Sequence, residues 1–366
     1  GARSHFGSSG FKRRAPLPAS PPPRPSTGRA APSYHRAAMA AAEGEANEAV
    51  PAGEQQRPQF EEKTENVPTT KAYKNVDYLT SADSRHIRIM CEVQEPAKRL
   101  NENAVDNYML FLGSHLMMHP EDRAKQIADL ERQVKAGGPR DELEALAAKI
   151  RFSKKLQPMD RFYVVALELG EKIARWSKER REKGLPSYHV VTGGGPGIME
   201  AANRGAHAAG EFTLGLGSTR PEWGSMNKYV STEGAFEFHY FFMRKFWMAF
   251  KCMGLIVFPG GYGSLDELFE FLALVSSKKI AHKMPIVLIG KEHWKKAVNF
   301  EYLAECSMLS REHAEMMVFM DTAEETFEYL VSQVTSADET GENTVVEDAK
   351  RRRLSKANST GGQKGE

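Results

Sequence analysis

The chain has 366 residues, of which 41% are hydrophobic and 27% are charged, an ordinary composition for a globular protein. Its formal net charge is +2, so the chain as a whole has no strong attraction to nucleic acid or to an anionic membrane surface. No run approaches the roughly 18 apolar residues of a membrane-spanning helix. The three cysteines lie far apart, which argues against a disulfide framework and fits a reducing compartment.

Both ends of the chain have the composition of segments that do not fold on their own. Residues 1–70 and 336–366 contain few large apolar groups, so we expect a single domain at 71–335 between disordered tails. The N-terminal segment has no acidic residue before Glu43 and is rich in Arg, Ser and Pro, which is typical of an organellar transit peptide. The first methionine is Met39, so a translated leader is an equal alternative. We therefore expect a cytoplasmic protein, or a plastid or mitochondrial one if residues 1–70 direct import.

The first elements expected in the core are an amphipathic helix at 85–100 and a buried strand at 107–112, which ends at Gly113–Ser114. A charged stretch follows at 121–157. Its apolar residues recur at the three-then-four spacing of helices, and Gly137–Gly138–Pro139 interrupts it. We interpret this stretch as an inserted helical hairpin, which is either a solvated arm or an oligomer contact.

Strands and helices then alternate along the chain. The patterns predict strands at 189–192, 212–217, 255–258 and 285–290, and helices at 163–183, 198–209, 237–251, 265–276 and 323–334. This alternation predicts an α/β fold: a Rossmann-like, doubly wound parallel sheet with helices on both faces. Ligands of such sheets bind at the carboxyl ends of the strands.

Two glycine-rich loops each follow a strand and open a helix. The first is Thr192-Gly-Gly-Gly-Pro-Gly197, with glycines at 193, 194, 195 and 197, and the second runs from Phe258 to Glu267 as FPGGYGSLDE. Glycines let backbone N–H groups approach an anion, and a helix start adds unpaired donors. The pair predicts a ligand that carries phosphate. The first loop does not fit GxGxxG, the strand that follows it ends without a ribose-binding acid, and neither loop has a P-loop lysine. We expect no NAD, no ATP-driven chemistry, no cofactor and no metal.

Glu267 has two interpretations. Ser264-Leu-Asp-Glu267 has the spacing of a capping box, with Ser264 as the N-cap. The same carboxylate also lies at the mouth of a phosphate-binding loop, where the reacting carbon of a sugar phosphate would be.

The helix expected at 237–251 is rich in aromatic residues and also carries Arg244 and Lys245. A buried guanidinium needs a partner, which would be an incoming phosphate, Glu267 or a purely structural acid. The aromatic residues Phe241, Phe242 and Trp247 would either stack on a base or pack in the core.

These motifs together resemble those of the Lonely Guy (LOG) family, in its longer type II branch, some relatives of which are labelled lysine decarboxylase-like. Pro259-Gly-Gly-Tyr-Gly-Ser-Leu-Asp-Glu267 is similar to the family signature P-G-G-x-G-T-x-x-E, with serine in place of threonine. Arg244–Lys245 resembles the family's R-K pair, and Thr192-Gly-Gly-Gly its phosphate loop. Gly113–Ser114 resembles its first strand exit. The similarity spans roughly residues 85 to 335.

The resemblance implies a cytokinin riboside 5′-monophosphate phosphoribohydrolase, which releases free base and ribose 5-phosphate from adenine nucleoside monophosphates, including AMP. It implies that Glu267 and Arg244 are catalytic. Substrate-binding roles carry over to Lys245, to Gly261, Tyr262, Gly263 and Ser264, to the first glycine loop, and to Gly113 and Ser114. It further suggests a homodimer or larger homo-oligomer, without nucleic-acid or membrane partners.

The chain departs from the family pattern at several positions. Phe241–Phe242 stands where the shorter branch has Met-His, Ala273 stands where a substrate-contacting threonine is frequent, and an acidic contact has only Glu222 as a counterpart. These changes concern base preference more than reaction type.

Our hypothesis from the residues is that Glu267 stabilises an oxocarbenium-like transition state while the loop at 193–197 holds the phosphate. The alternative is a non-catalytic nucleotide or molybdenum-cofactor carrier of the same fold, which would not need the Arg244 and Glu267 pair.

Overall fold

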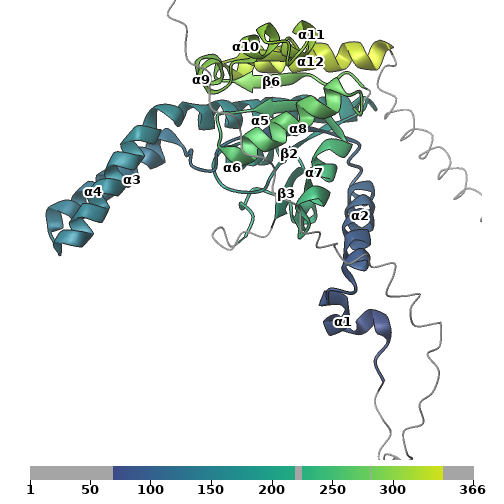
Figure 1. Ribbon diagram of the computed structural model, residues 1–366, viewed down its shortest axis with the longest axis horizontal. Helices are drawn as coiled ribbons and strands as arrows, with labels where there is room; N and C mark the ends of the chain where they lie inside the picture. The colour runs from purple at the N-terminus through teal and green to yellow at the C-terminus, as the bar shows by residue number, and fades with distance from the viewer. Residues whose placement is uncertain (1–68, 219–224, 281, 341–366) are drawn as a thin grey trace, which may run out of the picture. The chain divides into compact units, whose positions relative to one another are not determined.

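The computed structural model describes residues 69–218, 225–280 and 282–340 (Figure 1). The expected N-terminal targeting segment and most of the expected C-terminal tail lie outside these residues. The described residues from Thr70 onward belong to one compact unit. No helix within the described ranges is both long enough and apolar enough to cross a bilayer.

The core of this unit is a seven-stranded, entirely parallel sheet with the strand order β4-β3-β2-β1-β5-β6-β7. The expected Rossmann-like α/β fold is therefore confirmed. The central strands are buried along their whole length, as expected for strands with helices on both faces. The strands are β1 Asn107–Leu112, β2 Tyr188–Thr192, β3 Thr213–Ser218, β4 Ala235–Phe238, β5 Cys252–Val257, β6 Ile286–Ile289 and β7 Met317–Met320.

Alternate side chains of the strands pack into two separate cores. In β1, Tyr108, Leu110 and Leu112 face one core, while Met109 and Phe111 face the other. The first core is closed by α2 (Arg85–Glu102), α7 (Phe241–Phe250) and α8 (Tyr262–Ser276), and the second by α5 (Arg161–Glu182), α6 (Ile198–Ala208) and α12 (Ala323–Thr340). The remaining helices are α1 Val76–Thr80, α3 Pro120–Ala136, α4 Arg140–Leu156, α9 Lys291–Ala297, α10 Phe300–Glu305 and α11 Arg311–Ala314, with short 3₁₀ turns η1 Ala72–Lys74, η2 Gln157–Met159 and η3 Thr232–Gly234.

The two edge strands, β4 and β7, were not expected from the sequence. The expected helix at 237–251 is wrong at its start, because α7 begins only at Phe241 and β4 occupies 235–238. In β4, Phe236 and Phe238 are buried while Glu237 is exposed, which is the alternation of a strand. Because aromatic residues surround this short alternation, the sequence pattern indicated one continuous helix.

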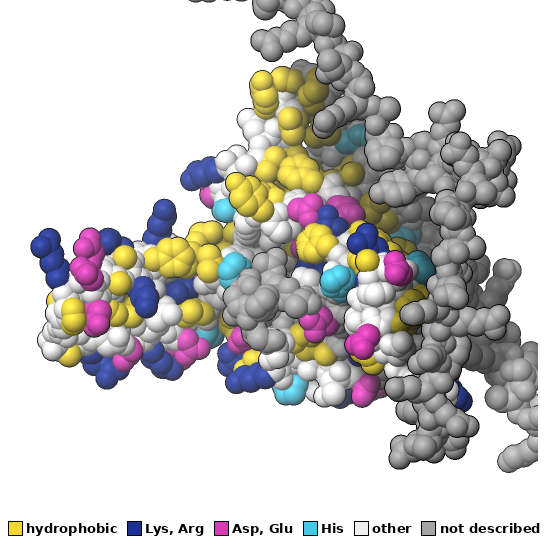
Figure 2. All heavy atoms as spheres, turned by 60° about the horizontal axis from the view of Figure 1, so that its bottom comes forward, with side chains coloured by type: hydrophobic (Ala, Val, Ile, Leu, Met, Phe, Trp, Pro, Cys, Tyr) yellow, Lys and Arg dark blue, Asp and Glu magenta, His cyan; other side chains and the backbone are white. Residues whose placement is uncertain are grey.

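The helices α3 and α4 lie side by side and extend away from the sheet (Figure 1). Charged side chains of both signs are spread along this arm (Figure 2). At its base, Arg123 and Asp160 form a buried, two-pronged ion pair, with Nε–Oδ2 and Nη2–Oδ1 distances of 2.7 and 3.1 Å. This pair joins the start of α3 to the start of α5.

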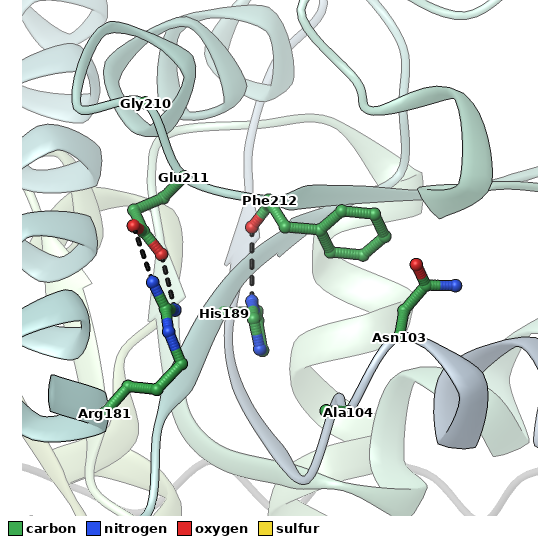
Figure 3. Close-up of a pocket in the computed structure, with 7 residues that line it drawn as sticks. All are labelled: Asn103, Ala104, Arg181, His189, Gly210, Glu211 and Phe212. Atoms are coloured by element: carbon green, nitrogen blue, oxygen red, sulfur yellow. Dashed lines mark hydrogen bonds and ion pairs between the residues drawn. The ribbon is translucent and has the colours of Figure 1, made fainter. Parts of the chain in front are cut away.

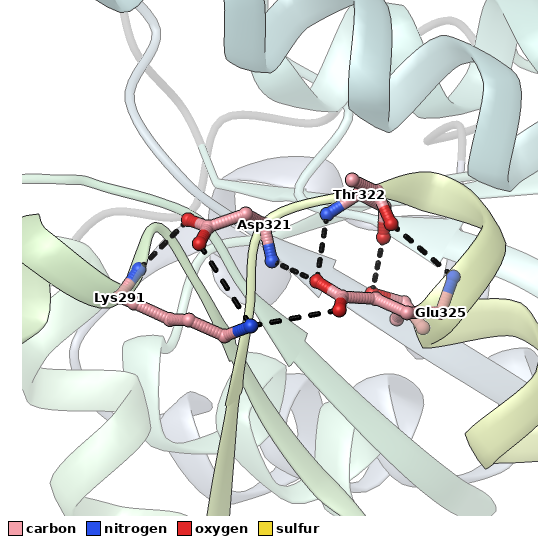
Figure 4. A network of polar contacts seen from close by, with 5 residues as sticks. Lys291, Asp321, Thr322 and Glu325 are labelled. Atoms are coloured by element: carbon pink, nitrogen blue, oxygen red, sulfur yellow. Dashed lines mark hydrogen bonds and ion pairs between the residues drawn. The ribbon is translucent and has the colours of Figure 1, made fainter.

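A polar network joins the starts of α9 and α12 beyond the ends of β6 and β7 (Figure 4). The Thr322 N–H donates to Glu325 Oε1 at 3.0 Å, and the Glu325 N–H donates to Thr322 Oγ1 at 3.3 Å. This reciprocal pair is a capping box at the start of α12. The ammonium of Lys291 forms ion pairs with the carboxylates of Asp321 and Glu325.

Candidate functional site

The strand order reverses between β1 and β5, and the loops that follow these two strands are in contact. The Ser114 N–H donates to the Pro259 carbonyl at 3.0 Å. A Cβ on Gly260 would lie 3.5 Å from the backbone of Gly113. Open α/β sheets bind ligands at such a reversal point, so Gly113–Ser114 and the 259–263 loop lie where the fold favours a ligand.

The helix after β5 begins earlier than the sequence suggested. Gly261 is the N-cap of α8 and Tyr262 its first residue, so Ser264 is the third helical residue and Glu267 lies in the second turn. The expected capping box at 264–267 is therefore wrong. The glycine run continues directly into the helix, which shifts the helix start by one turn. Glu267 therefore does not cap α8, which was the structural alternative to a chemical role.

Glu267 instead pairs with Arg244 of α7. Its Oε1 lies 3.1 Å from Arg244 Nη1, and both side chains are about nine-tenths buried, with exposed fractions of 8% and 10%. Arg244 Nε also donates to the Leu216 carbonyl at the end of β3, at 2.8 Å. Burial raises the pKa of Glu267 above its ordinary value, although the Arg244 guanidinium acts in the opposite direction. The pair thus combines a fixed cation with a carboxylate whose proton affinity is increased.

The glycine loop after β2 lies against this pair. A Cβ on Gly193 would be 2.8 Å from Nη2 of Arg244 and 3.0 Å from the sulfur of Met199, so a side chain there would displace the guanidinium from its present position. Gly197 has a φ of +75°, and a Cβ on it would be 2.3 Å from the Ser114 carbonyl oxygen. The loops after β1, β2 and β5 are therefore packed into one region around Arg244.

Several backbone donors in this region are unused. In the described part of the chain, the N–H groups of Tyr262, Gly263 and Ser264 at the start of α8 meet no acceptor, nor do those of Gly195 and Gly197. A Cβ on Gly261 or Gly263 would meet nothing within 4 Å, so neither glycine is required by packing within the chain. Uncovered N–H groups at a helix start are suited to an anion.

Residues 199–330 match the family described as possible lysine decarboxylase. The match includes Arg244 and Glu267, and it confirms at the family level the resemblance seen in the motifs. No curated protein matches the sequence significantly.

Three solved structures are similar to the chain at low identity. The structural-genomics target TM1055 has 17% identity and a TM-score of 0.37, over 62% of this chain and 99% of its own. A molybdenum cofactor binding protein from Rippkaea orientalis has 19% identity and a TM-score of 0.32, over 46% and 88%. A Moco carrier protein from Chlamydomonas reinhardtii has 16% identity and a TM-score of 0.36, over 63% and 99%.

Lys245, which the family resemblance assigns to substrate binding, is already engaged. Its ammonium lies 2.7 Å from Asp266 and 2.8 Å from Glu270, both on α8. Burial opposes its charge, but the hydrogen bonds to these two carboxylates outweigh burial and raise the pKa of Lys245. In this structure the side chain joins α7 to α8 beside the Arg244–Glu267 pair.

The aromatic residues of α7 and the residues where this chain departs from the family pattern fall into different environments. Trp247 is buried in the first core, and its indole N–H donates to the Glu92 carbonyl, so it does not present a stacking face. Phe241 and Phe242 are exposed, and the Arg244 guanidinium lies 5.3 Å from the centre of the Phe241 ring. Ala273 is exposed on α8. Glu222 lies outside the described residues.

A buried polar network behind the first glycine loop was missed by the sequence reasoning. Asn203 accepts a hydrogen bond from Thr192 Oγ1 at 2.7 Å and donates to Thr213 Oγ1 at 2.7 Å. Asn227 bonds both Asn203 and the loop itself. The available signal was weak: an asparagine inside a helix, and two glycines inside the strand Leu-Gly-Leu-Gly, where a strand glycine often marks a close approach of another segment.

A separate cavity of about 250 Å³ opens at the opposite, amino end of the sheet, beside the starts of β2 and β3 (Figure 3). Its charged groups are satisfied, because Arg181 forms two hydrogen bonds with Glu211. His189 Nδ1 bonds the Phe212 carbonyl at 3.2 Å, and burial lowers the pKa of this histidine. We therefore place the candidate site at the carboxyl end of the sheet.

Proposed function

We propose that the protein hydrolyses the N-glycosidic bond of adenine nucleoside 5′-monophosphates, AMP or its N-substituted cytokinin forms, to free base and ribose 5-phosphate. The observation that carries the proposal is the buried Arg244–Glu267 pair, 3.1 Å apart, beside loops with unused backbone donors. A buried ion pair contributes little net stability compared with apolar residues of the same volume. Its presence among anion-receptive loops is therefore best explained by chemistry.

In the proposed reaction, the bond between ribose C1′ and the base nitrogen breaks, and its electron pair leaves with the base. Positive charge develops on the sugar, as in other glycosidic cleavages. Glu267 stabilises this charge and accepts a proton from the attacking water, whose oxygen bonds C1′. This proton then passes through solvent to the departing base, which leaves Glu267 ionised again. A carboxylate of raised pKa is a better proton acceptor than an ordinary glutamate, which suits this role near neutral pH.

Arg244 has two roles in this proposal. Its guanidinium favours the ionised form of Glu267 and so acts against the effect of burial on the pKa of this carboxylate. Its Nη2 reaches the edge of the first glycine loop at Gly193, so it also adds positive charge where the 5′-phosphate would be bound.

The family description names lysine decarboxylation, and the residues here do not fit that chemistry. Decarboxylation of an amino acid requires an electron sink such as pyridoxal phosphate, held by a lysine of lowered pKa. Lys245, which adjoins the pair, has the opposite property, since two carboxylates hold it and raise its pKa.

The oligomeric state belongs to the same proposal. Phe242, Phe246 and Phe250 recur every four residues on the outer side of α7, and 43–56% of each side chain is exposed. We propose that this face is a contact in a homodimer, which light scattering of the full chain would test. The three cysteines are unbridged, so we propose a reducing compartment, either the cytoplasm or an organelle.

The deciding experiment is a substrate panel of AMP, isopentenyl-AMP, GMP and CMP, with the released base measured by chromatography. We expect release of the adenine bases, and a loss of about 100- to 1,000-fold in kcat for Glu267→Gln, the effect of removing one electrostatic stabiliser. Nucleotide binding should persist. Asp266→Asn is the matched control, because it removes the neighbouring half-exposed carboxylate of the same helix and leaves the pair intact.

Two outcomes would overturn the proposal. Near-normal turnover by Glu267→Gln would remove the assigned role of this carboxylate. Binding of nucleotides without release of any base would favour the alternative, a nucleotide or molybdenum-cofactor carrier.

A further inference from the structure

We infer that Asn227 is a positioning residue that aims the first glycine loop at the phosphate of the substrate. The inference rests on the proposed function, because it assigns the phosphate to this loop. Asn227 makes two hydrogen bonds to this loop. The Asn227 backbone N–H donates to the Gly194 carbonyl at 2.8 Å, and its Nδ2 donates to the Gly195 carbonyl at 3.0 Å.

The first of these bonds, made by the Asn227 backbone, determines which way a loop donor points, and the second holds the next peptide, Gly195–Pro196, which has no N–H. The N–H and C=O of one peptide unit point in opposite directions. Because Asn227 holds the carbonyl of Gly194, the N–H of Gly195 in the same peptide unit is turned to the other side, where it meets no acceptor in the described chain. The Gly194 N–H is not available, since it donates to Thr192 Oγ1 at 2.9 Å. Asn227 therefore keeps one particular loop donor open for an anion.

The amide of Asn227 is itself held in place. Its Nδ2 also donates to Asn203 Oδ1 at 3.0 Å, and its Oδ1 accepts from the Tyr229 N–H at 3.2 Å. Asn203 is fully buried and is bonded in turn to Thr192 and Thr213. Both acceptors of Nδ2 are oxygens that cannot donate, so the position requires a donor group. An aspartate there would place an oxygen against two oxygens.

The neighbouring residue anchors the segment independently. The thioether of Met226 lies over three glycines: a Cβ on Gly194, Gly215 or Gly217 would come within 2.8–3.0 Å of its side-chain atoms. This packing does not depend on the amide of Asn227. A change of the side chain at 227 should therefore leave the segment docked and alter chiefly the Gly195–Pro196 peptide, which adjoins the open Gly195 N–H.

The glycines of the loop explain why hydrogen bonds from Asn227 are useful. Gly194 has a φ of +74° and no side chain to restrict it, so its peptide can rotate easily unless something holds it. Donors that are already aimed at the anion avoid an ordering cost on binding. Loss of the side-chain bond from Asn227 to the loop should therefore weaken the binding of phosphate-bearing ligands only.

The test measures binding by calorimetry for AMP, ribose 5-phosphate and adenosine, with Asn227→Asp, Asn227→Ala and wild type. We expect Asn227→Asp to bind AMP and ribose 5-phosphate at least about tenfold more weakly, the effect of replacing one polar contact by an unfavourable one, and adenosine within twofold of wild type. Both variants keep the backbone bond to Gly194, but Asn227→Ala adds no oxygen against the two acceptors, so its loss should be smaller. In turnover, KM for AMP should rise while kcat stays within about threefold, as expected for lost ground-state binding.

The control is Asn103→Asp, the same change at the opposite end of the sheet, which should bind all three ligands normally. Thermal unfolding of each variant establishes that it is folded, and Asn227→Ala carries the test if Asn227→Asp does not fold. Unchanged affinity for both phosphate ligands, or an equal loss for adenosine, would overturn the inference. A wild-type protein that binds these ligands without cleaving them would refute the proposed hydrolysis and leave the Asn227 inference standing.

Discussion

The Arg244→Met substitution would test whether the Arg244–Glu267 pair exists as a buried, mutually dependent unit. The change keeps an apolar side chain of similar length but leaves Glu267 without its counter-charge. At an effective dielectric constant of about 20, two unit charges 3.1 Å apart attract by about 5 kcal/mol before desolvation is counted. Breaking one side of a buried pair typically costs about 3–5 kcal/mol. We expect a loss of that order in the free energy of unfolding at pH 8.

The size of this loss should depend on pH. Burial already raises the pKa of Glu267, and removing Arg244 removes the group that lowers it. A folded-state pKa above the unfolded value means that the folded protein binds the extra proton, so stability falls as pH rises through the folded pKa. Arg244→Met should therefore be closer to wild type at pH 5 than at pH 8, because a lower pH favours the uncharged form of the unpaired Glu267.

Urea unfolding at both pH values measures this, with Glu267→Gln and the double variant completing a cycle. The double variant should be more stable than Arg244→Met at pH 8 by more than about 1 kcal/mol, because no buried charge remains unpaired. Arg132→Met is the control, since it breaks an exposed pair with Asp129 that should be worth less than about 1 kcal/mol. Equal losses for the two arginine variants at pH 8, without a pH effect, would refute the described pair.

Two further predictions concern the starts of helices. Gly263→Ala should raise the free energy of unfolding by about 0.5–1 kcal/mol, because residue 263 is helical, has open space around it and does not have a positive φ. The same change should weaken AMP binding, because the new side chain covers a backbone donor. A gain in both stability and affinity would contradict this prediction. Thr322→Ala should cost about 1 kcal/mol in thermal unfolding through loss of its capping bond, whereas Ser264→Ala should cost less, because Ser264 is not an N-cap. Equal losses of stability in the two variants would show that Thr322 and Ser264 both act as N-caps.

Those two sequences show where local reasoning failed. Ser264-Leu-Asp-Glu267 and Thr322-Ala-Glu-Glu325 have the same capping pattern, but only the second forms a capping box. The difference lies outside the four residues. The 259–263 loop continues into α8 one turn early, whereas the chain before Thr322 leaves β7 and turns at Asp321, whose N–H also donates to Glu325.

The edge strands show a second limit. The strands β1, β2, β5 and β6 are apolar enough to be recognised alone, because both of their faces are buried. In contrast, β4 has four residues and gains its identity from pairing with β3, a partner that local patterns do not reveal. The same holds for β7, which pairs only with β6 among the described strands.

By itself, the sequence determined the fold class and the two glycine loops, because apolar periodicity and glycine runs act over a few neighbouring residues. It also named Arg244 and Glu267, but it left the partner of each undecided. Only the tertiary structure decided that they face each other, that Lys245 is held by Asp266 and Glu270, and that Asn227 clamps the Gly194–Gly195 peptide. Such pairings join segments far apart in the chain, and they form only when the sheet brings the carboxyl ends of its strands together.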